Sequence, residues 1–196
     1  MEGRERERRM RKPSPREEHA VVLDYLPNGY ALSDTPSYRK RAIGQAIGVD
    51  YFTLLEVSPK QGLSFSIGER IYVGSEDRDK VEVIVGRIPL SKLTATARAE
   101  IELFLEERIK SDEGRFVEFF NRAGPLSMRM HSIELIPGIG KKVMWEIIEE
   151  RDRVEPFKSF EDMYARIDKL PDLAKGIKKR ILDELDGKDK HKLFTK

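Results

Sequence analysis

The chain has 196 residues, of which 39% are hydrophobic and 37% are charged, with a formal net charge of +2. No stretch approaches the ~20 apolar residues of a membrane span, and the charged N-terminus is unlike a secretory signal, so we expect a cytoplasmic protein without a membrane partner. The absence of cysteine excludes disulfides, thiolate zinc sites and a cysteine nucleophile.

The first 16 residues are basic and nearly free of large apolar side chains. Seven Lys and Arg residues stand against three glutamates, which leaves a local net charge of +4. A segment of this composition cannot bury enough surface to fold alone. We expect residues 1–16 to form a flexible arm that either contacts nucleic acid or only aids solubility.

Residues 17–90 have the pattern of a β domain. Branched and aromatic residues recur in short runs, and Asn28-Gly29 is typical of a tight hairpin turn between strands. About five short strands suit a small OB-like β-barrel. The expected strands cover residues 19–26, 30–32, 51–57, 70–73 and 80–85.

One basic insert falls inside this β domain. Residues 36–48 carry Arg39, Lys40 and Arg41, and we expect them to form a loop or short helix on the rim of the barrel. The basic run is either a nucleic-acid contact or a solvated loop. The aromatic residues Tyr30, Phe52, Phe65 and Tyr72 either stack on bases or fill the core, with Phe52 expected in the core.

The pattern becomes helical after Pro89. Apolar residues recur at helical spacing over residues 94–109 and 113–123, and Gly124-Pro125 ends the second helix. We therefore predict an α+β fold of two domains, hinged near residues 89–93. The OB-like barrel is followed by connecting helices (91–130) and an all-α domain with tandem hairpins (131–190).

A glycine-containing turn carries the functional prediction. Pro137-Gly138-Ile139-Gly140 joins a short helix at 132–136 to a helix that runs from Lys141 to about Arg151. Glycine permits unusual backbone angles and close approach of a ligand, and the unpaired amides at a helix N-terminus favour an anion. Lys141 and Lys142 follow at once and can reach flanking phosphates. We expect Ile139 to point inward against Leu135, Met144 and Ile147.

These residues, Ile133 to Arg151, resemble the helix-hairpin-helix pattern of many DNA-repair and recombination proteins. Such hairpins commonly occur in pairs, and Leu170-Pro171-Asp172 resembles a degenerate second copy without the Gly-x-Gly element. Ser159 begins the preceding helix with a capping box, and residues 173–185 form the following one. The second copy is either a structural partner or a further phosphate contact through its basic residues Lys175, Lys178 and Lys179. The shared core is expected to include Trp145, Phe157, Phe160 and Ile181.

The order of the segments also resembles an uncharacterised archaeal family of predicted nucleic-acid-binding proteins with an OB-like domain and a C-terminal helix-hairpin-helix domain. The resemblance covers nearly the whole chain and implies binding of RNA or DNA without naming a target. It is carried most clearly by residues 51–56, 115–121, 135–150 and 192–195.

No pattern in the sequence indicates catalysis or a cofactor. The three histidines are scattered without metal-binding spacing, and neither a P-loop nor a nucleophile elbow occurs. Glycosylases that use this hairpin carry a catalytic aspartate beyond it, and Asp162 or Asp168 would fall in range, but their base-pocket domain is missing. We expect a non-enzymatic protein that binds RNA or DNA through the phosphate backbone. The alternative is an adaptor in a ribosomal, repair or RNA-processing assembly that docks through the hairpins or residues 116–120.

Overall fold

The structure is a computed structural model that describes residues 16–30, 41–187 and 189–196. The N-terminal half of the described chain forms a five-stranded antiparallel sheet with the order β4-β1-β2-β3-β5. Its strands are β1 (His19–Leu26), β2 (Ile43–Gly48), β3 (Leu54–Pro59), β4 (Arg70–Tyr72) and β5 (Val81–Arg87).

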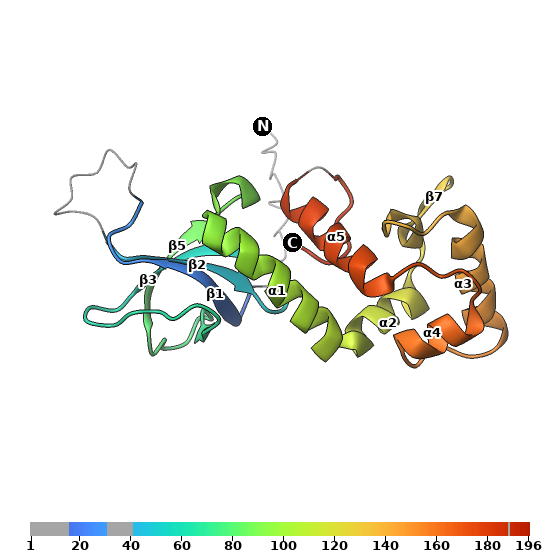
Figure 1. Cartoon of the computed structure of the whole chain (residues 1–196), viewed down its shortest axis with the longest axis horizontal. Coiled ribbons are helices and arrows are strands. Elements are labelled where there is room, and N and C mark those ends of the chain that lie inside the picture. Colours follow the sequence, from blue (N-terminus) through green and yellow to red (C-terminus); the bar gives the residue numbers. More distant parts are fainter. Residues whose placement is uncertain (1–15, 31–40, 188) are drawn as a thin grey trace, which may run out of the picture.

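The C-terminal half of the described chain is mainly helical. Figure 1 shows the sheet at one end of an elongated molecule and the smaller helices at the other, with the first long helix running between them. The elements are η2 (Leu90–Lys92), α1 (Ala95–Ser111), α2 (Glu113–Arg122), β6 (Pro125–Ser127), β7 (Met130–His131), η3 (Ser132–Leu135), α3 (Lys141–Arg153), α4 (Phe160–Arg166) and α5 (Leu173–Leu185).

Strand β1 contributes buried apolar residues to both faces of the sheet, since successive side chains of a strand point to opposite faces. In β1, Ala20 and Val22 belong to one buried cluster, which also holds Phe65 and Ile71. Leu23 belongs to the second and larger cluster, which continues into the helices. A register shift between Val22 and Asp24 adds an irregularity to this strand.

Strand β2 corrects the prediction that residues 36–48 form a loop or short helix. Ile43–Gly48 is the central strand of the sheet, paired with β1 and β3, and residues 36–40 lie outside the described part of the chain. Gly44 is needed in this strand because a side chain there would lie 2.8 Å from the ring of Phe65. Gly44 thus allows close packing at the centre of the sheet, where β2 is almost entirely buried.

The prediction of two domains, with an OB-like barrel and a separate all-α domain, is wrong. Strands β4 and β5 lie at opposite edges, so the sheet is a curled half-barrel rather than a closed barrel. Helix α1 packs against β1 and β2 and also against α2 and α5. As a result one hydrophobic core runs from Ile47 in the sheet to Ile181 in α5.

Hydrogen bonds join the junction near residues 89–93 to the sheet. The side chain of Gln45 donates to the carbonyl of Lys92 at 2.9 Å and accepts from the amide of Thr94 at 2.9 Å. The hydroxyl of Thr94 donates to Asp24 at 2.6 Å and caps α1 by accepting from the amide of Ala97. These bonds fix the direction in which α1 leaves the sheet.

The C-terminal segment closes the same core. The buried carboxylate of Glu184 accepts from the amides of Leu193, Phe194 and Thr195 at 2.8–3.0 Å. The ring of Phe194 then packs against Phe116 and Phe119 of α2. Along the described stretches, every helix is too short or too polar to cross a membrane.

Candidate nucleic-acid interface

The first hairpin connects η3 to α3 through a tight turn. The amide of Ile139 donates to the carbonyl of Ile136 at 3.0 Å, and Gly138 between them has a φ of +95°, in the region that favours glycine. Gly140 is the N-cap residue of α3, and none of the described side chains caps this end of the helix. Gly138 and Gly140 are exposed, so the first amides of α3 are accessible to an anion.

Ile139 anchors the hairpin from below. Its side chain is 5% exposed and shares a core cluster with Met144 and Ile147, as predicted, while Leu135 is only half-buried. The alternation of exposed Gly138, buried Ile139 and exposed Gly140 holds the turn on the core and leaves its outer edge free. Ile139 therefore anchors the turn to the core.

Two lysines stand beside this turn. Lys141 is exposed, and Lys142 is 86% exposed with a long ion pair of 3.8 Å to Glu146. A surface ion pair of this kind contributes little, so it competes weakly with a phosphate. Both ammonium groups are available to a polyanion at the start of α3.

The second hairpin uses its amides internally. The carboxylate of Asp172 caps α5 by accepting from the amide of Lys175 at 2.9 Å. The hydroxyl of Tyr164 accepts from the amide of Leu173 at 2.8 Å. Two donors that could hold a phosphate are therefore already occupied by side chains of the same chain.

The two hairpins pack against each other. A side chain at Gly138 would lie 3.2 Å from Cβ of Pro171, and one at Gly176 in α5 would lie 2.8 Å from the carbonyl oxygen of Pro137. Each hairpin thus rests on a glycine of the other. This contact favours a structural role for the second copy.

The predicted shared core is correct for three aromatic or aliphatic residues and wrong for one. Phe157 and Ile181 are buried and Phe160 is partly buried against the same cluster. Trp145 is 58% exposed. Trp145 lies one turn after Lys141. It therefore shares a helix face with Lys141 and Lys142, whereas Met144 points to the buried face.

The lysines of the second hairpin differ in their environment. Lys175 and Lys179 are exposed. The ammonium of Lys178 bonds to Glu102 at 2.8 Å and Glu106 at 2.6 Å in α1, and these two hydrogen bonds raise the pKa of Lys178. Lys178 therefore ties α5 to α1 and is a poorer candidate for a phosphate ligand.

The basic run of the insert is not brought to the hairpins. Arg39 and Lys40 lie outside the described residues, and Arg41 is exposed just before β2. The sheet that contains β2 is at the opposite end of the molecule from α3 (Figure 1). Any contact of Arg41 with nucleic acid is separate from that of the hairpin.

The aromatic residues of the sheet are engaged within the protein. Phe52 and Phe65 are buried, and the ring of Tyr72 packs edge-on against His19. The hydroxyl of Tyr30 donates to Glu56 at 2.6 Å, and burial followed by this hydrogen bond raises the pKa of Tyr30 to about 12. None of these four offers an open ring face comparable to that of Trp145.

A groove beside the first hairpin was not predicted from the sequence. It has a volume of about 450 Å³ and lies between the β6–β7 hairpin and the start of α3. Lys141 and Trp145 form one wall, and Met128, Arg129 and His131 contribute to the other. The sequence did carry a signal for this groove. Lys141 and Lys142 lie on the same helix face as Trp145, and a face with two lysines is unsuited to the core.

His131 lies in this groove and caps the short helix beside it. Its Nδ1 accepts from the amide of Ile133 at 3.3 Å and caps η3. Burial lowers the pKa of His131, and the nearby cation of Arg151 lowers it further. With Nδ1 as the acceptor, the proton of the neutral ring is on Nε2.

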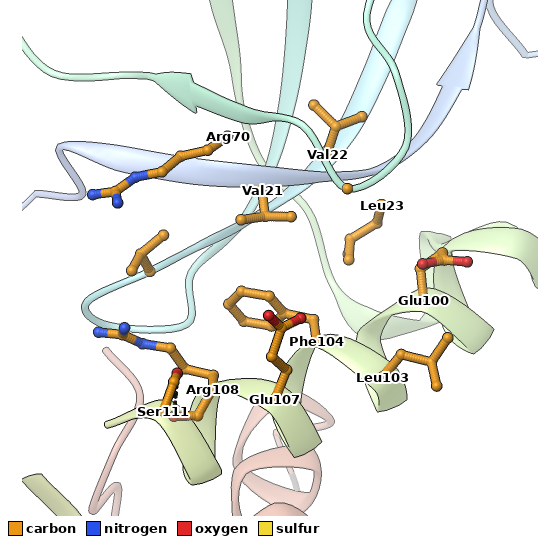
Figure 2. A pocket seen from close by; sticks show the side chains of 12 residues that line it. Val21, Val22, Leu23, Arg70, Glu100, Leu103, Phe104, Glu107, Arg108 and Ser111 are labelled. Carbon is orange, nitrogen blue, oxygen red and sulfur yellow. Dashed lines mark hydrogen bonds between the residues drawn. The ribbon is translucent and has the colours of Figure 1, made fainter. Parts of the chain in front are cut away.

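A second cavity, of about 320 Å³, lies between β1 and α1. Figure 2 shows Phe104 and Leu103 of α1 below Val21 and Leu23 of β1, with Arg108 and Glu107 near the rim. Its charged residues are of both signs, which does not favour a polyanion. No group of His, Asp or Glu suited to a metal ion occurs among the residues that the structure describes.

The apolar face of α2 is covered. Phe116 and Phe120 are fully buried, and Phe119 packs on Phe120 and on Phe194. An adaptor that docks through residues 116–120 would have to displace the C-terminal segment. Residues 116–120 therefore do not present an open docking face, and docking through the hairpins stays the other form of the adaptor hypothesis.

Comparison with known proteins shows the family of the chain. Residues 16–196 match the model of a family described as "Protein of unknown function (DUF655)", and the chain belongs to this family. It is 43% identical over 187 residues to the uncharacterized protein MJ0038 of Methanocaldococcus jannaschii. The matched region covers 94% of this chain and 82% of that protein. The crystal structure of Af1531 from Archaeoglobus fulgidus is similar, with a TM-score of 0.80, 41% identity, and coverage of 92% of this chain and 100% of that one.

Proposed function

We propose that this protein is a non-enzymatic RNA- or DNA-binding protein that holds the phosphate backbone with its first helix-hairpin-helix element. One observation carries the proposal. The N-cap residue of α3 is an exposed glycine, Gly140, and no described side chain caps the helix. The first two residues of α3, Lys141 and Lys142, are also exposed. Unpaired amides, the helix dipole and two cations thus favour an anion at the same place.

Helix α2 also begins without a side-chain cap among the described residues, but α1 and α5, the other helices of 13 or more residues, begin differently. Thr94 caps α1, and Asp172 caps α5, each by accepting from an amide in the first turn. Helix N-termini prefer such residues because an unpaired amide is otherwise left to solvent. Gly140 has no side chain that could accept from the first amides of α3. This supports the proposal that a ligand is the acceptor, at the position where the helix-hairpin-helix pattern implies a phosphate.

Binding of this kind has limited sequence specificity. Backbone amides and lysines contact phosphates, which are alike in every nucleotide, whereas sequence is read at base edges. The net charge of only +2 implies a local contact rather than attraction by the whole surface. For some four to six neutralised phosphates, the slope of log K against log salt is about −3 to −5.

The proposal is tested by giving α3 the cap that α5 has. Gly140 has a φ of −87°, and a side chain there would meet nothing within 4 Å, so Gly140→Asp fits the fold. The new carboxylate accepts from the α3 amides and repels phosphate. We expect affinity for RNA and DNA of any sequence to fall at least ~10-fold, or about 1.4 kcal/mol, by fluorescence anisotropy.

Gly140→Ala is the matched control. It adds a Cβ in the same open space but neither a cap nor a charge, so we expect its affinity to fall less than that of Gly140→Asp. Thermal unfolding shows whether both variants are folded. Unchanged binding by a folded Gly140→Asp protein would contradict the proposal, as would a binding constant that does not respond to salt.

A further inference from the structure

The groove between the β6–β7 hairpin and α3 adjoins the uncapped start of α3. Its apolar surface comes from Trp145, Met128 and Met130, and its charged groups include Lys141 and Arg129 as cations and Glu134 as an anion. A volume of about 450 Å³ lies within the roughly 300–1,000 Å³ range of ordinary ligand sites. The groove therefore combines apolar walls with a small excess of positive charge.

We infer that this groove takes an unpaired nucleobase of the strand whose phosphate is held at Gly140, so that the preferred ligand is nucleic acid with an unpaired nucleotide. This inference rests on the proposed function and narrows its substrate class. A base is flat and apolar on its faces and is joined to an anionic backbone. It matches an exposed indole ring that is flanked by cations.

Trp145 is the residue on which the base stacks. Its side chain is 58% exposed on a rigid helix, although large aromatic residues are usually mostly buried. Arg129 on the opposite wall is exposed, and the neighbouring Met128 is fully exposed. An open aromatic face with positive charge on either side favours a nucleotide over an uncharged apolar partner.

The spacing along α3 connects the two contacts. Lys141 and Trp145 are four residues apart, so they lie on the same helix face, about 6 Å apart along the axis. A strand held by a phosphate at the helix start can place an adjacent base over the indole ring. Bases inside an intact duplex are stacked on each other and cannot make this contact, whereas bases in loops and strand ends can.

The test uses the intrinsic fluorescence of the full-length protein, because Trp145 is its only tryptophan. Three probes are compared, namely a blunt DNA duplex, the same duplex with a single-stranded overhang, and that overhang built from abasic nucleotides. Anisotropy of a dye on the DNA measures binding, and Trp145 emission measures stacking. We expect all three to bind, with tryptophan quenching and roughly 10-fold tighter binding only for the overhang that carries bases.

Variants separate the ring from the rest of the surface. Trp145→Ala should reduce affinity for the base-carrying overhang roughly 10-fold and leave blunt-duplex binding unchanged, while Trp145→Phe restores part of the loss. Val154→Ala, at an equally exposed position just after α3, is the matched control and should have no effect.

The outcomes distinguish this inference from the proposed function. If the probes bind but the overhang neither quenches Trp145 nor binds more tightly than its abasic form, the base site is overturned while phosphate binding stands, and a protein partner for Trp145 becomes the better hypothesis. If Trp145→Ala binds the overhang as the wild type does, the base site is also overturned. Failure of all three DNA probes and of their RNA counterparts to bind overturns both.

Discussion

The two hairpins of this protein have similar positions at the start of a helix but use their amides in opposite ways. At the first, α3 begins after Gly140 with no side-chain acceptor. At the second, Asp172 accepts from the amide of Lys175, and Tyr164 accepts from the amide of Leu173. The start of α3 thus has no side-chain acceptor among the described residues, whereas the second hairpin satisfies its donors within the chain.

The lysines beside the two hairpins also differ in exposure and in their ion pairs. Lys142 next to the first hairpin is 86% exposed, whereas the side chain of Lys178 beyond the second is 20% exposed and bonded to two glutamates of α1. The comparison teaches that a repeated backbone shape does not define a binding site. In the proposed function, the residue at the capping position distinguishes the two hairpins, with a carboxylate at the second and a glycine at the first.

The largest expected effect comes from separating the hairpins. Gly176→Val places a side chain where Cβ is 2.8 Å from the carbonyl oxygen of Pro137, so the first hairpin must shift. Overpacking of this kind destabilises by about 1–3 kcal/mol, which lowers Tm by roughly 2–12 °C. Thermal unfolding measures the change.

Gly140→Val is the control for this substitution, since the same side chain there meets nothing within 4 Å. Valine is a poorer N-cap residue than glycine, so we expect some loss of Tm, but a smaller one than for Gly176→Val because no clash is added. Equal losses of Tm at the two positions would show that the hairpins are not held by the contact at Gly176.

The next effect in size comes from removing the internal cap. Asp172→Ala frees the amide of Lys175 and should destabilise the protein by about 1 kcal/mol, or roughly 2–4 °C in Tm. Nucleic-acid affinity should not fall, because a negative charge is lost and the first hairpin is untouched. A loss of affinity comparable to that of Gly140→Asp would mean that the second hairpin is the binding element.

The smallest effects compare two neighbouring lysines. Lys178→Met should lower Tm by a few degrees or less, because it leaves Glu102 and Glu106 without their shared cation, and should not change the salt dependence of binding. Lys179→Met should leave Tm unchanged and, if Lys179 contacts a phosphate, reduce the slope of log K against log salt by about 1.

The pH dependence sharpens the comparison of these lysines. The pKa of Lys178 is raised above its usual 10.5, so its stabilisation is fully present below that pH and is lost as pH rises through the higher folded-state pKa. The Tm difference between wild type and Lys178→Met should therefore be constant near neutral pH and shrink at alkaline pH. A difference that disappears at neutral pH would exclude the ion pairs as its cause.

Local signals in the sequence predicted much of the helical part. Thr94 and Ser159 were readable as starts of α1 and α4, and the residues of α5 were predicted at their observed bounds. Capping and helical periodicity are local properties, which a sequence displays directly. The turn at Gly138 with Ile139 buried beneath it was predicted for the same reason.

Features that depend on distant contacts were missed. Strand β2 was predicted as a loop or short helix, and its two glycines are explained by distant neighbours, Phe65 and Val57 at Gly44 and Glu17 at Gly48. The division into two domains failed because α1 buries residues against the sheet and α5 at once. Trp145 was assigned to the core by residue type, although its helix face is that of two lysines.

The amides of α3 provide the most direct test of the central claim. In a ¹⁵N-labelled sample, a short duplex with an overhang is added, and the backbone amide signals are followed by NMR. We predict that the signals of Gly140, Lys141 and Lys142 shift until saturation, while those of Leu173 and Lys175 stay in place because their donors are occupied. Saturable binding with no shift at Gly140–Lys142 would contradict the account.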